Sequence, residues 1–112
     1  MEGETIRLPC RFNPSLIRHS TNELVYYWQK TTTSSKGSKD VAAVNSNSLV
    51  KEYVLESQSH EGRYDLRIDA AQYDRDNGQF ECKIKESGSG TEILSVTYVV
   101  TILSKYCISI YH

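Results

Sequence analysis

The 112-residue sequence has no long hydrophobic run and no excess of charge of either sign. Its longest nearly unbroken apolar run covers residues 96–103, whereas a membrane-spanning helix needs about 20 apolar residues. Thirteen lysines and arginines face fourteen aspartates and glutamates, which leaves a formal net charge of −1 at pH 7. Proteins that bind nucleic acids or anionic membranes normally carry a basic patch. This balance therefore argues against a nucleic-acid partner and against membrane contact by these residues.

The sequence also lacks two processing signals. It does not open with a basic segment followed by an apolar one, as a secretory leader would. We therefore expect any signal or membrane-anchoring segment to lie outside these residues. No asparagine begins an acceptable N-glycosylation sequon, because Pro14 follows Asn13 and the other asparagines lack Ser or Thr two positions later. We expect no N-linked glycan to cover the surface.

What is present is a set of short segments with apolar–polar alternation or many β-branched and aromatic residues, both of which are typical of strands. These segments are residues 4–12, 24–30, 41–44, 49–55, 62–68, 79–85 and 93–103. No long segment keeps a helical period. Many short strands separated by turn signals predict an all-β sandwich or barrel.

Two of the three cysteines, Cys10 and Cys82, lie on the apolar faces of alternating segments far apart in the chain. The sequence has no CxxC pair and no Cys/His cluster, which argues against a zinc site. A catalytic cysteine would need a base nearby. His19, His60 and His112 fall in two loops and the tail, and chain distance alone leaves a spatial pairing open.

Four features together resemble the immunoglobulin superfamily. They are Cys10, Trp28 in an aromatic segment, the run 66–68, and residues 76–82, which read Asp-Asn-Gly-Gln-Phe-Glu-Cys. The resemblance covers residues 1–103 and implies an immunoglobulin-like β-sandwich of two antiparallel sheets with Greek-key connections. The long stretch between Trp28 and Arg63 leaves room for extra strands, which implies a variable-type domain. Residues 104–112, with Cys107, form a tail, a linker or an addition to the natural chain.

The resemblance also implies roles for particular residues. Cys10 and Cys82 would form a disulfide between the sheets, packed against Trp28. Such a bond persists in oxidising compartments, so we expect an extracellular location, in the ectodomain of a plasma-membrane protein. The other expected core residues are Leu66, Ile68 and Phe80.

Arg63 and Asp76 match the salt bridge that closes one end of the sandwich in this superfamily. The chain departs from the pattern at Phe80, where the family usually has a tyrosine whose hydroxyl bonds the adjacent corner. We therefore expect the Arg63–Asp76 pair to carry more of the task of holding that corner. The chain also begins almost at the strand of Cys10, so the preceding strand is missing or shortened, which leaves a sheet edge exposed or covered by a neighbour.

Residues that alternate with the expected core residues should share the outer face of one sheet. Tyrosine beside aliphatic and polar groups suits a protein-contact surface, although single apolar residues on a solvated surface are ordinary. The members of this candidate face are Tyr27, Gln29, Glu81, Lys83, Lys85, Ile93, Ser95, Thr97 and Val99.

Two groups within the superfamily offer comparisons. Residues 73–83 and the valine-rich final segment are similar to adhesion receptors of the echinoid and nephrin-like groups, and residues 23–29 are similar to B7-type ligands. The first match is longer and implies a cell-surface adhesion receptor that binds a like or related immunoglobulin domain. The alternative is a B7-like immune ligand or a secreted binding protein of the same fold. The sequence shows no nucleophile–base–orienter set and no phosphate loop, so we expect neither an enzyme nor a cofactor.

Overall fold

A computed structural model describes residues 3–15, 23–58 and 61–102 of the chain. The elements, in chain order, are β1 (Ile6–Leu8), β2 (Leu24–Thr32), η1 (Thr33–Ser35), β3 (Asp40–Val44), β4 (Asn47–Ser48), β5 (Tyr53–Gln58), β6 (Arg63–Ile68), α2 (Tyr73–Asp76), β7 (Gly78–Glu86) and β8 (Glu92–Val100). Cys107, the tail 104–112, and residues 16–22 between β1 and β2 lie outside the described residues.

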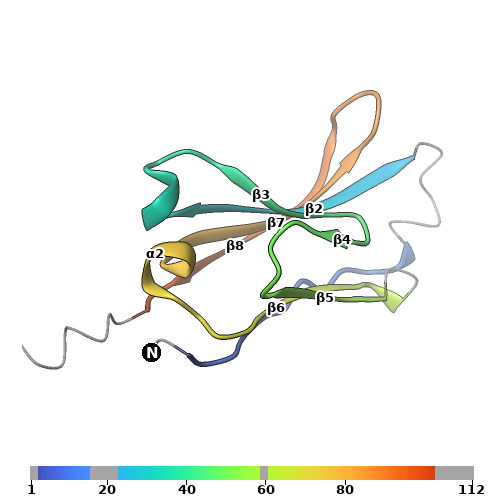
Figure 1. Ribbon diagram of the computed structural model, residues 1–112. Coiled ribbons are helices and arrows are strands. Elements are labelled where there is room, and N and C mark those ends of the chain that lie inside the picture. The colour runs from blue at the N-terminus through green and yellow to red at the C-terminus, as the bar shows by residue number, and fades with distance from the viewer. Residues whose placement is uncertain (1–2, 16–22, 59–60, 103–112) are drawn as a thin grey trace, which may run out of the picture.

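The strands form two sheets that face each other (Figure 1). One sheet has the order β1-β6-β5 and the other the order β4-β3-β2-β7-β8. All neighbouring strands in both sheets are antiparallel. The chain crosses between the sheets after β1, after β4 and after β6, so each sheet combines strands that are distant in sequence. The expected sandwich of two antiparallel sheets is confirmed.

The core between the sheets is aromatic and aliphatic, and the disulfide crosses it. Cys82 in β7 is bonded to Cys10, which follows β1, across 72 positions of sequence. Closing a loop of this length stabilises the folded state by about 4 to 5 kcal/mol in the chain-entropy model. Trp28 is fully buried and donates its indole N–H to the carbonyl oxygen of Tyr64 at 3.0 Å. Leu66, Ile68 and Phe80 are also fully buried.

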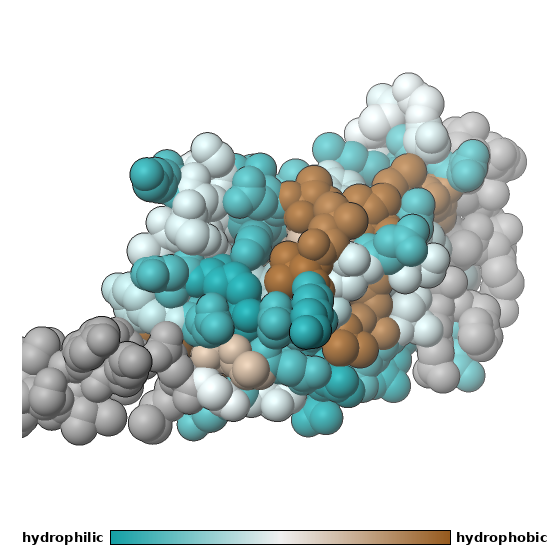
Figure 2. All heavy atoms as spheres, in the orientation of Figure 1, coloured by the Kyte–Doolittle hydropathy of each residue, from teal (hydrophilic) through white to brown (hydrophobic). Residues whose placement is uncertain are grey.

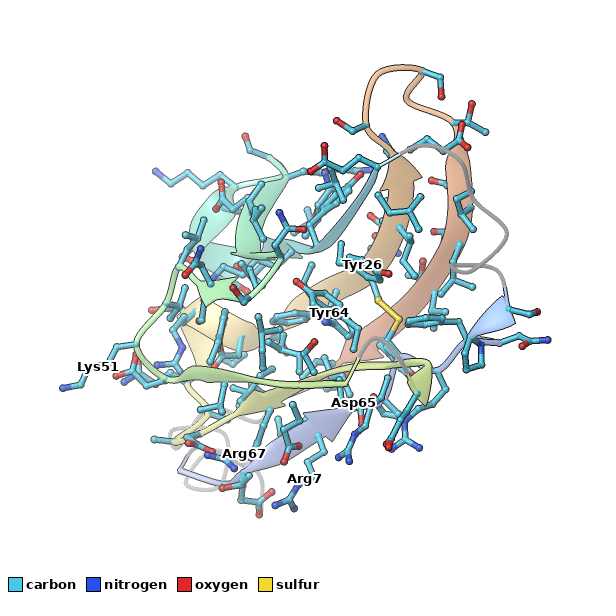
Figure 3. The ribbon with its side chains drawn as sticks, turned by 90° about the vertical axis from the view of Figure 1, so that its right-hand side faces the viewer. Arg7, Tyr26, Lys51, Tyr64, Asp65 and Arg67 are labelled. Carbon is cyan, nitrogen blue, oxygen red and sulfur yellow. A yellow bond between two sulfur atoms is a disulfide. The ribbon has the colours of Figure 1, made fainter. Side chains whose placement is uncertain are left out.

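Two expected strands, residues 4–12 and 49–55, contain much less regular strand in the structure than expected. Regular pairing in the 4–12 segment is limited to β1, followed by an isolated bridge between Arg11 and Arg63, because Pro9 has no N–H to donate. Within 49–55, only the final residues belong to a strand, since β5 begins at Tyr53. The preceding residues form a turn that carries the chain from one sheet to the other (Figure 3, near Lys51). Where a chain passes from one sheet to the other, its hydrogen bonds to the neighbouring strand of the first sheet must end.

The corner between β6 and β7 is held by a buried network around Asp76. This carboxylate is fully buried and accepts bonds from the Tyr53 hydroxyl at 2.5 Å and from the Gln72 N–H at 2.8 Å. The Arg75 guanidinium donates to both carboxylate oxygens, at 2.8 and 2.6 Å. Lys30 donates to the Tyr53 hydroxyl and to the Arg75 carbonyl oxygen, both at 3.1 Å. Phe80 has no hydroxyl to hold this corner, and the network around Asp76 holds it instead.

The expected Arg63–Asp76 salt bridge is not the pairing found. Arg63 donates to Asp65 at 2.9 Å, and Asp65 also binds the Arg11 guanidinium at 2.8 Å. The reason is strand register: Arg63 pairs with the end of β5, whereas Tyr53, at its start, pairs with Ile68. Five residues of strand separate the two ends by about 17 Å. Arg63 therefore lies at the opposite end of the sandwich from the corner.

The sheet edge at β1 has no further strand among the described residues, in which β1 pairs only with β6. Arg7 in this strand and Arg67 in its neighbour point outward from the three-stranded sheet (Figure 3). Arg7 lies 3.7 Å from Glu56, and Arg67 lies 2.9 Å from Asp69. These ion pairs keep charge along this sheet, which discourages unwanted strand pairing at its edge.

Candidate functional site

The outer face of the five-stranded sheet brings most of the candidate residues into cross-strand rows. Tyr27 lies opposite Lys83, and Gln29 lies opposite Glu81. On the far side of β7, Lys83 lies opposite Ser95, and Glu81 lies opposite Thr97. These residues alternate with the buried Trp28 and Cys82, so their side chains project away from the core.

Lys85, at the end of β7, and Ile93, in β8, are placed by a bulge, whereas Val99 of β8 pairs regularly with Gln79. The register of the β7–β8 pair shifts between Ile84 and Lys85, so that Leu94 faces Ile84 while Lys85 faces Glu92. Ile93 is the extra residue of this irregularity, a feature that locally re-aims side chains. It is half-buried and lies outside the main core cluster. Lys85 places its ammonium 5.8 Å from the ring centroid of Tyr27.

A row of alternating charges crosses this face. Lys39 lies 3.4 Å from Glu81, Glu81 lies 3.8 Å from Lys83, and Lys83 lies 3.4 Å from Glu92. The row therefore reads positive, negative, positive, negative, with no net charge. A hydrogen bond and the charge interaction with Tyr27 raise the pKa of Lys85, which keeps that side chain cationic at the same surface.

The face also carries exposed apolar and unsatisfied polar groups. Val99 is 75% exposed, a larger fraction than for Leu49 and Val41, the other exposed large apolar residues in the described part of the chain. The side-chain oxygen of Gln29 is buried but has no hydrogen-bond partner within the described ranges. A buried acceptor without a partner costs about 1 to 3 kcal/mol.

Residues of β3 extend the face beyond what the sequence indicated. Val44 lies opposite Tyr27, and Val41 lies opposite Gln29, with a register shift between them. Figure 2 shows apolar side chains gathered over the β3–β4 edge of the sheet. Val41, at the start of β3, is 40% exposed. Because of this register shift, residues 41–44 do not follow a strict alternation between the two faces of the sheet. Alternation alone therefore did not assign Val41 and Val44 to the outer face. We call this enlarged surface, from β3 to β8, the outer face.

Two kinds of feature are absent from residues 3–15, 23–58 and 61–102. No helix among them is long and apolar enough to cross a bilayer. Within the same ranges, no three His, Cys, Asp or Glu side chains are grouped to hold a metal ion.

Comparison with known proteins rests on three-dimensional similarity. No protein-family model matches the sequence, and no curated protein matches it. The structure is similar to that of the NK cell receptor Nkp44, with a TM-score of 0.69, 14% identity, and coverage of 91% of this chain and 92% of that chain. It is also similar to Tim-1, with a TM-score of 0.66 and 18% identity over 93% of this chain and 88% of that chain.

A third similar structure is that of the RIG-5 IG1 homodimer. Its TM-score is 0.64 and its identity 14%, over 91% of this chain and 84% of that chain. At such identities the similarity establishes the fold. Together with the strand order β4-β3-β2-β7-β8 and the Cys10–Cys82 disulfide, it shows that the chain folds as a variable-type immunoglobulin domain.

Proposed function

We propose that this domain is a protein-recognition module in the extracellular part of a cell-surface adhesion receptor, and that it binds another immunoglobulin domain through the outer face. The observation that carries the proposal is the composition of that face: an aromatic ring, exposed valines and a balanced charge row on one sheet. Such mixed surfaces suit protein partners, because aromatic anchors and satisfied polar rims provide binding energy.

The charge row favours an immunoglobulin domain of the same kind as the partner. In a dimer with a two-fold axis at the middle of this row, the second copy presents the same row in reverse order, negative, positive, negative, positive. Each charge of one copy then faces a charge of opposite sign on the other. The RIG-5 IG1 domain forms a homodimer, and it also forms an IG1–IG1 heterodimer with ZIG-8. These domains support pairing between immunoglobulin domains as a use of this fold.

The extracellular location is supported by the disulfide, which would be reduced in the cytosol. The adhesion role, rather than that of a B7-like ligand, is supported by the longer resemblance of residues 73–83 to echinoid and nephrin-like receptors. The balanced composition, with a net charge of −1, also suits a protein partner better than an anionic one.

Self-association measured by sedimentation tests the proposal. We expect a concentration-dependent dimer whose dissociation constant rises about tenfold on Tyr27→Ala, since truncating a central aromatic anchor commonly costs 1 to 2 kcal/mol. Val99→Asp should weaken it further by placing an uncompensated charge in the interface. Arg7→Ala is the control, because Arg7 projects from the other sheet and its removal should leave the dimer unchanged.

The alternatives are separable by the same variants. A dimer that neither Tyr27→Ala nor Val99→Asp weakens would show that another surface is used. A chain that stays monomeric at all concentrations excludes the homophilic form, and the variants are then applied to partners found by screening extracellular domains. A partner that binds both variants as tightly as the unmodified domain would contradict the outer face as the binding surface.

A further inference from the structure

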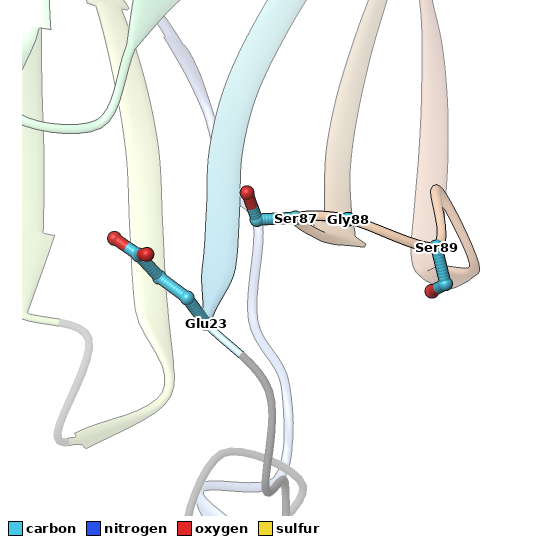
Figure 4. A pocket seen from close by; sticks show the side chains of 4 residues that line it. All are labelled: Glu23, Ser87, Gly88 and Ser89. Carbon is cyan, nitrogen blue, oxygen red and sulfur yellow. The ribbon is translucent and has the colours of Figure 1, made fainter.

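Two small hollows lie on either side of the start of β2, at the end of the sandwich that carries the β7–β8 hairpin. One is about 290 Å³ and is lined by Glu23, Ser87, Gly88 and Ser89 (Figure 4). The other is about 300 Å³ and is lined by Glu23, Leu24, Tyr26, Asn45, Ser46, Ser57 and Tyr64. Glu23 borders both. Its side chain points away from Ser87 and Ser89, toward the strands on the other side of β2 (Figure 4), which places the carboxylate on the side of the second hollow.

The walls of the second hollow are fixed by hydrogen bonds between three parts of the chain. The Tyr64 hydroxyl donates to the carbonyl oxygens of Asn45 at 2.7 Å and Tyr26 at 3.2 Å. Asn45 and Tyr26 are joined in both directions: the Asn45 N–H donates to the Tyr26 carbonyl at 2.7 Å, and the Tyr26 N–H donates to the Asn45 side-chain oxygen at 3.1 Å. The hollow is therefore part of the folded framework and does not depend on a side chain moving aside.

Its chemistry is acidic and aromatic. The half-buried ring of Tyr26 supplies the aromatic wall; it lies 5.5 Å from the ring of Tyr64, which is buried with 1% exposure (Figure 3). Glu23 supplies a carboxylate that makes no ion pair with any described residue, and none of the described residues that line the hollow is basic. Burial raises the pKa of Tyr26, so its hydroxyl stays neutral and can accept or donate a hydrogen bond. Ser46 and Ser57 add two more hydroxyl groups at the rim.

We propose that this hollow is a binding site for an arginine side chain of a partner protein. A guanidinium group pairs with a carboxylate through two parallel N–H bonds and packs its flat face on aromatic rings. The hollow offers both partners within one small volume, with hydroxyl oxygens left to accept the remaining N–H groups. A lysine ammonium would use the carboxylate but would match the aromatic wall less well, because its charge is compact and strongly hydrated.

The site is separate from the outer face. Leu24 and Tyr26 lie on the opposite side of β2 from Tyr27 and Gln29, since side chains alternate along a strand. The arginine site can therefore exist whether or not the outer face pairs two domains. It would give the module a second contact, at the end of the sandwich, for a partner that carries a basic loop.

NMR titration of the isotopically labelled domain with N-acetylarginine amide tests the proposal. We expect saturable shifts of the amide signals of Tyr26, Ser46 and Tyr64. N-acetylcitrulline amide has nearly the same shape without the charge, and it should shift these signals far less. Glu23→Gln should raise the dissociation constant for the arginine probe about fivefold, as for loss of a partly exposed ion pair. Glu86→Gln, which alters a nearby glutamate that lines neither hollow, should leave it unchanged.

Three results would overturn the site. They are equal shifts with the citrulline probe, shifts confined to other parts of the domain, and an unchanged dissociation constant in Glu23→Gln. The folded state of Glu23→Gln is checked by its spectrum without ligand, which should match that of the unmodified domain away from residue 23. Sedimentation of the same variant separates the two proposals, because loss of arginine binding with unchanged self-association leaves the outer face untouched.

Discussion

The hydroxyl of Tyr53 is the link between two buried charges, and Tyr53→Phe removes it without changing the shape of the ring. In the native structure this hydroxyl donates to Asp76 at 2.5 Å and accepts from Lys30 at 3.1 Å. The Tyr53 residue is 2% exposed, and its ring packs edge-on against Phe80 with centroids 6.0 Å apart. The substitution keeps this packing, so any loss of stability comes from the hydrogen bonds.

The expected loss is about 2 to 3 kcal/mol. A hydrogen bond to a charged group contributes about 1.5 to 3 kcal/mol, and this hydroxyl makes one to a carboxylate and one to an ammonium. Asp76 would keep its bonds from Arg75 and Gln72, and Lys30 would keep the Arg75 carbonyl, so neither charge is left alone. Asp76→Ala should cost more, about 3 to 5 kcal/mol, because it removes the buried carboxylate whose charge stabilises Lys30 and binds Arg75, although Arg75 keeps an ion pair with Glu52 at 3.2 Å.

Urea unfolding followed by tryptophan fluorescence measures these losses, because Trp28 reports the core. The urea concentration at the unfolding midpoint should fall, while the slope of the unfolding free energy against urea concentration stays constant. This combination indicates a change in stability alone. In a double-mutant cycle, Tyr53→Phe and Asp76→Asn should be coupled by about 1 kcal/mol or more, as residues in one network are. Tyr27→Phe is the surface control and should change stability by less than about 0.5 kcal/mol. A Tyr53→Phe loss as small as the control would refute the corner network.

Three further changes probe other parts of the fold. Burial alone would raise the pKa of Asp65, but bonds from Arg11, the Cys10 N–H and Arg63 hold the pKa below its usual value. The carboxylate therefore stabilises the fold above its unfolded pKa of about 4, and this contribution is lost progressively as the pH falls from there through the lower folded pKa. The unfolding midpoints of the unmodified domain and of Asp65→Asn should converge over that range. Gly62→Ala should cost more than about 2 kcal/mol in urea unfolding, because the added carbon would lie 1.9 Å from the Phe12 carbonyl oxygen at a φ of +78°. Replacing Cys10 and Cys82 by alanine should lower the free energy of unfolding by about 4 to 5 kcal/mol, and an unchanged value would show that the disulfide is not stabilising.

The strands and the core followed from the sequence because both depend on local alternation. Because side chains alternate along a strand, Leu66 and Ile68 point inward and Arg67 between them points outward. This alternation can be read without knowing the partner strand. The segment 79–85 likewise placed Phe80 and Cys82 together on one face. The turn before β5 was not foreseen, because the apolar residues of 49–55 suit a strand locally and only the change of sheet breaks the pairing.

Side-chain pairing between strands was decided by the tertiary structure. The motif positions of Arg63 and Asp76 suggested a bridge, yet the register of β5 with β6 sets them at opposite ends of the sandwich and gives Asp76 to Tyr53 and Arg75. The hollow beside Glu23 also depends on several distant segments meeting at one end. Alternation along a single strand determines which face of the sheet a residue occupies. The residues that meet across strands depend on the register of the strands and on where the chain changes sheets. Both of these depend on residues that are distant in sequence.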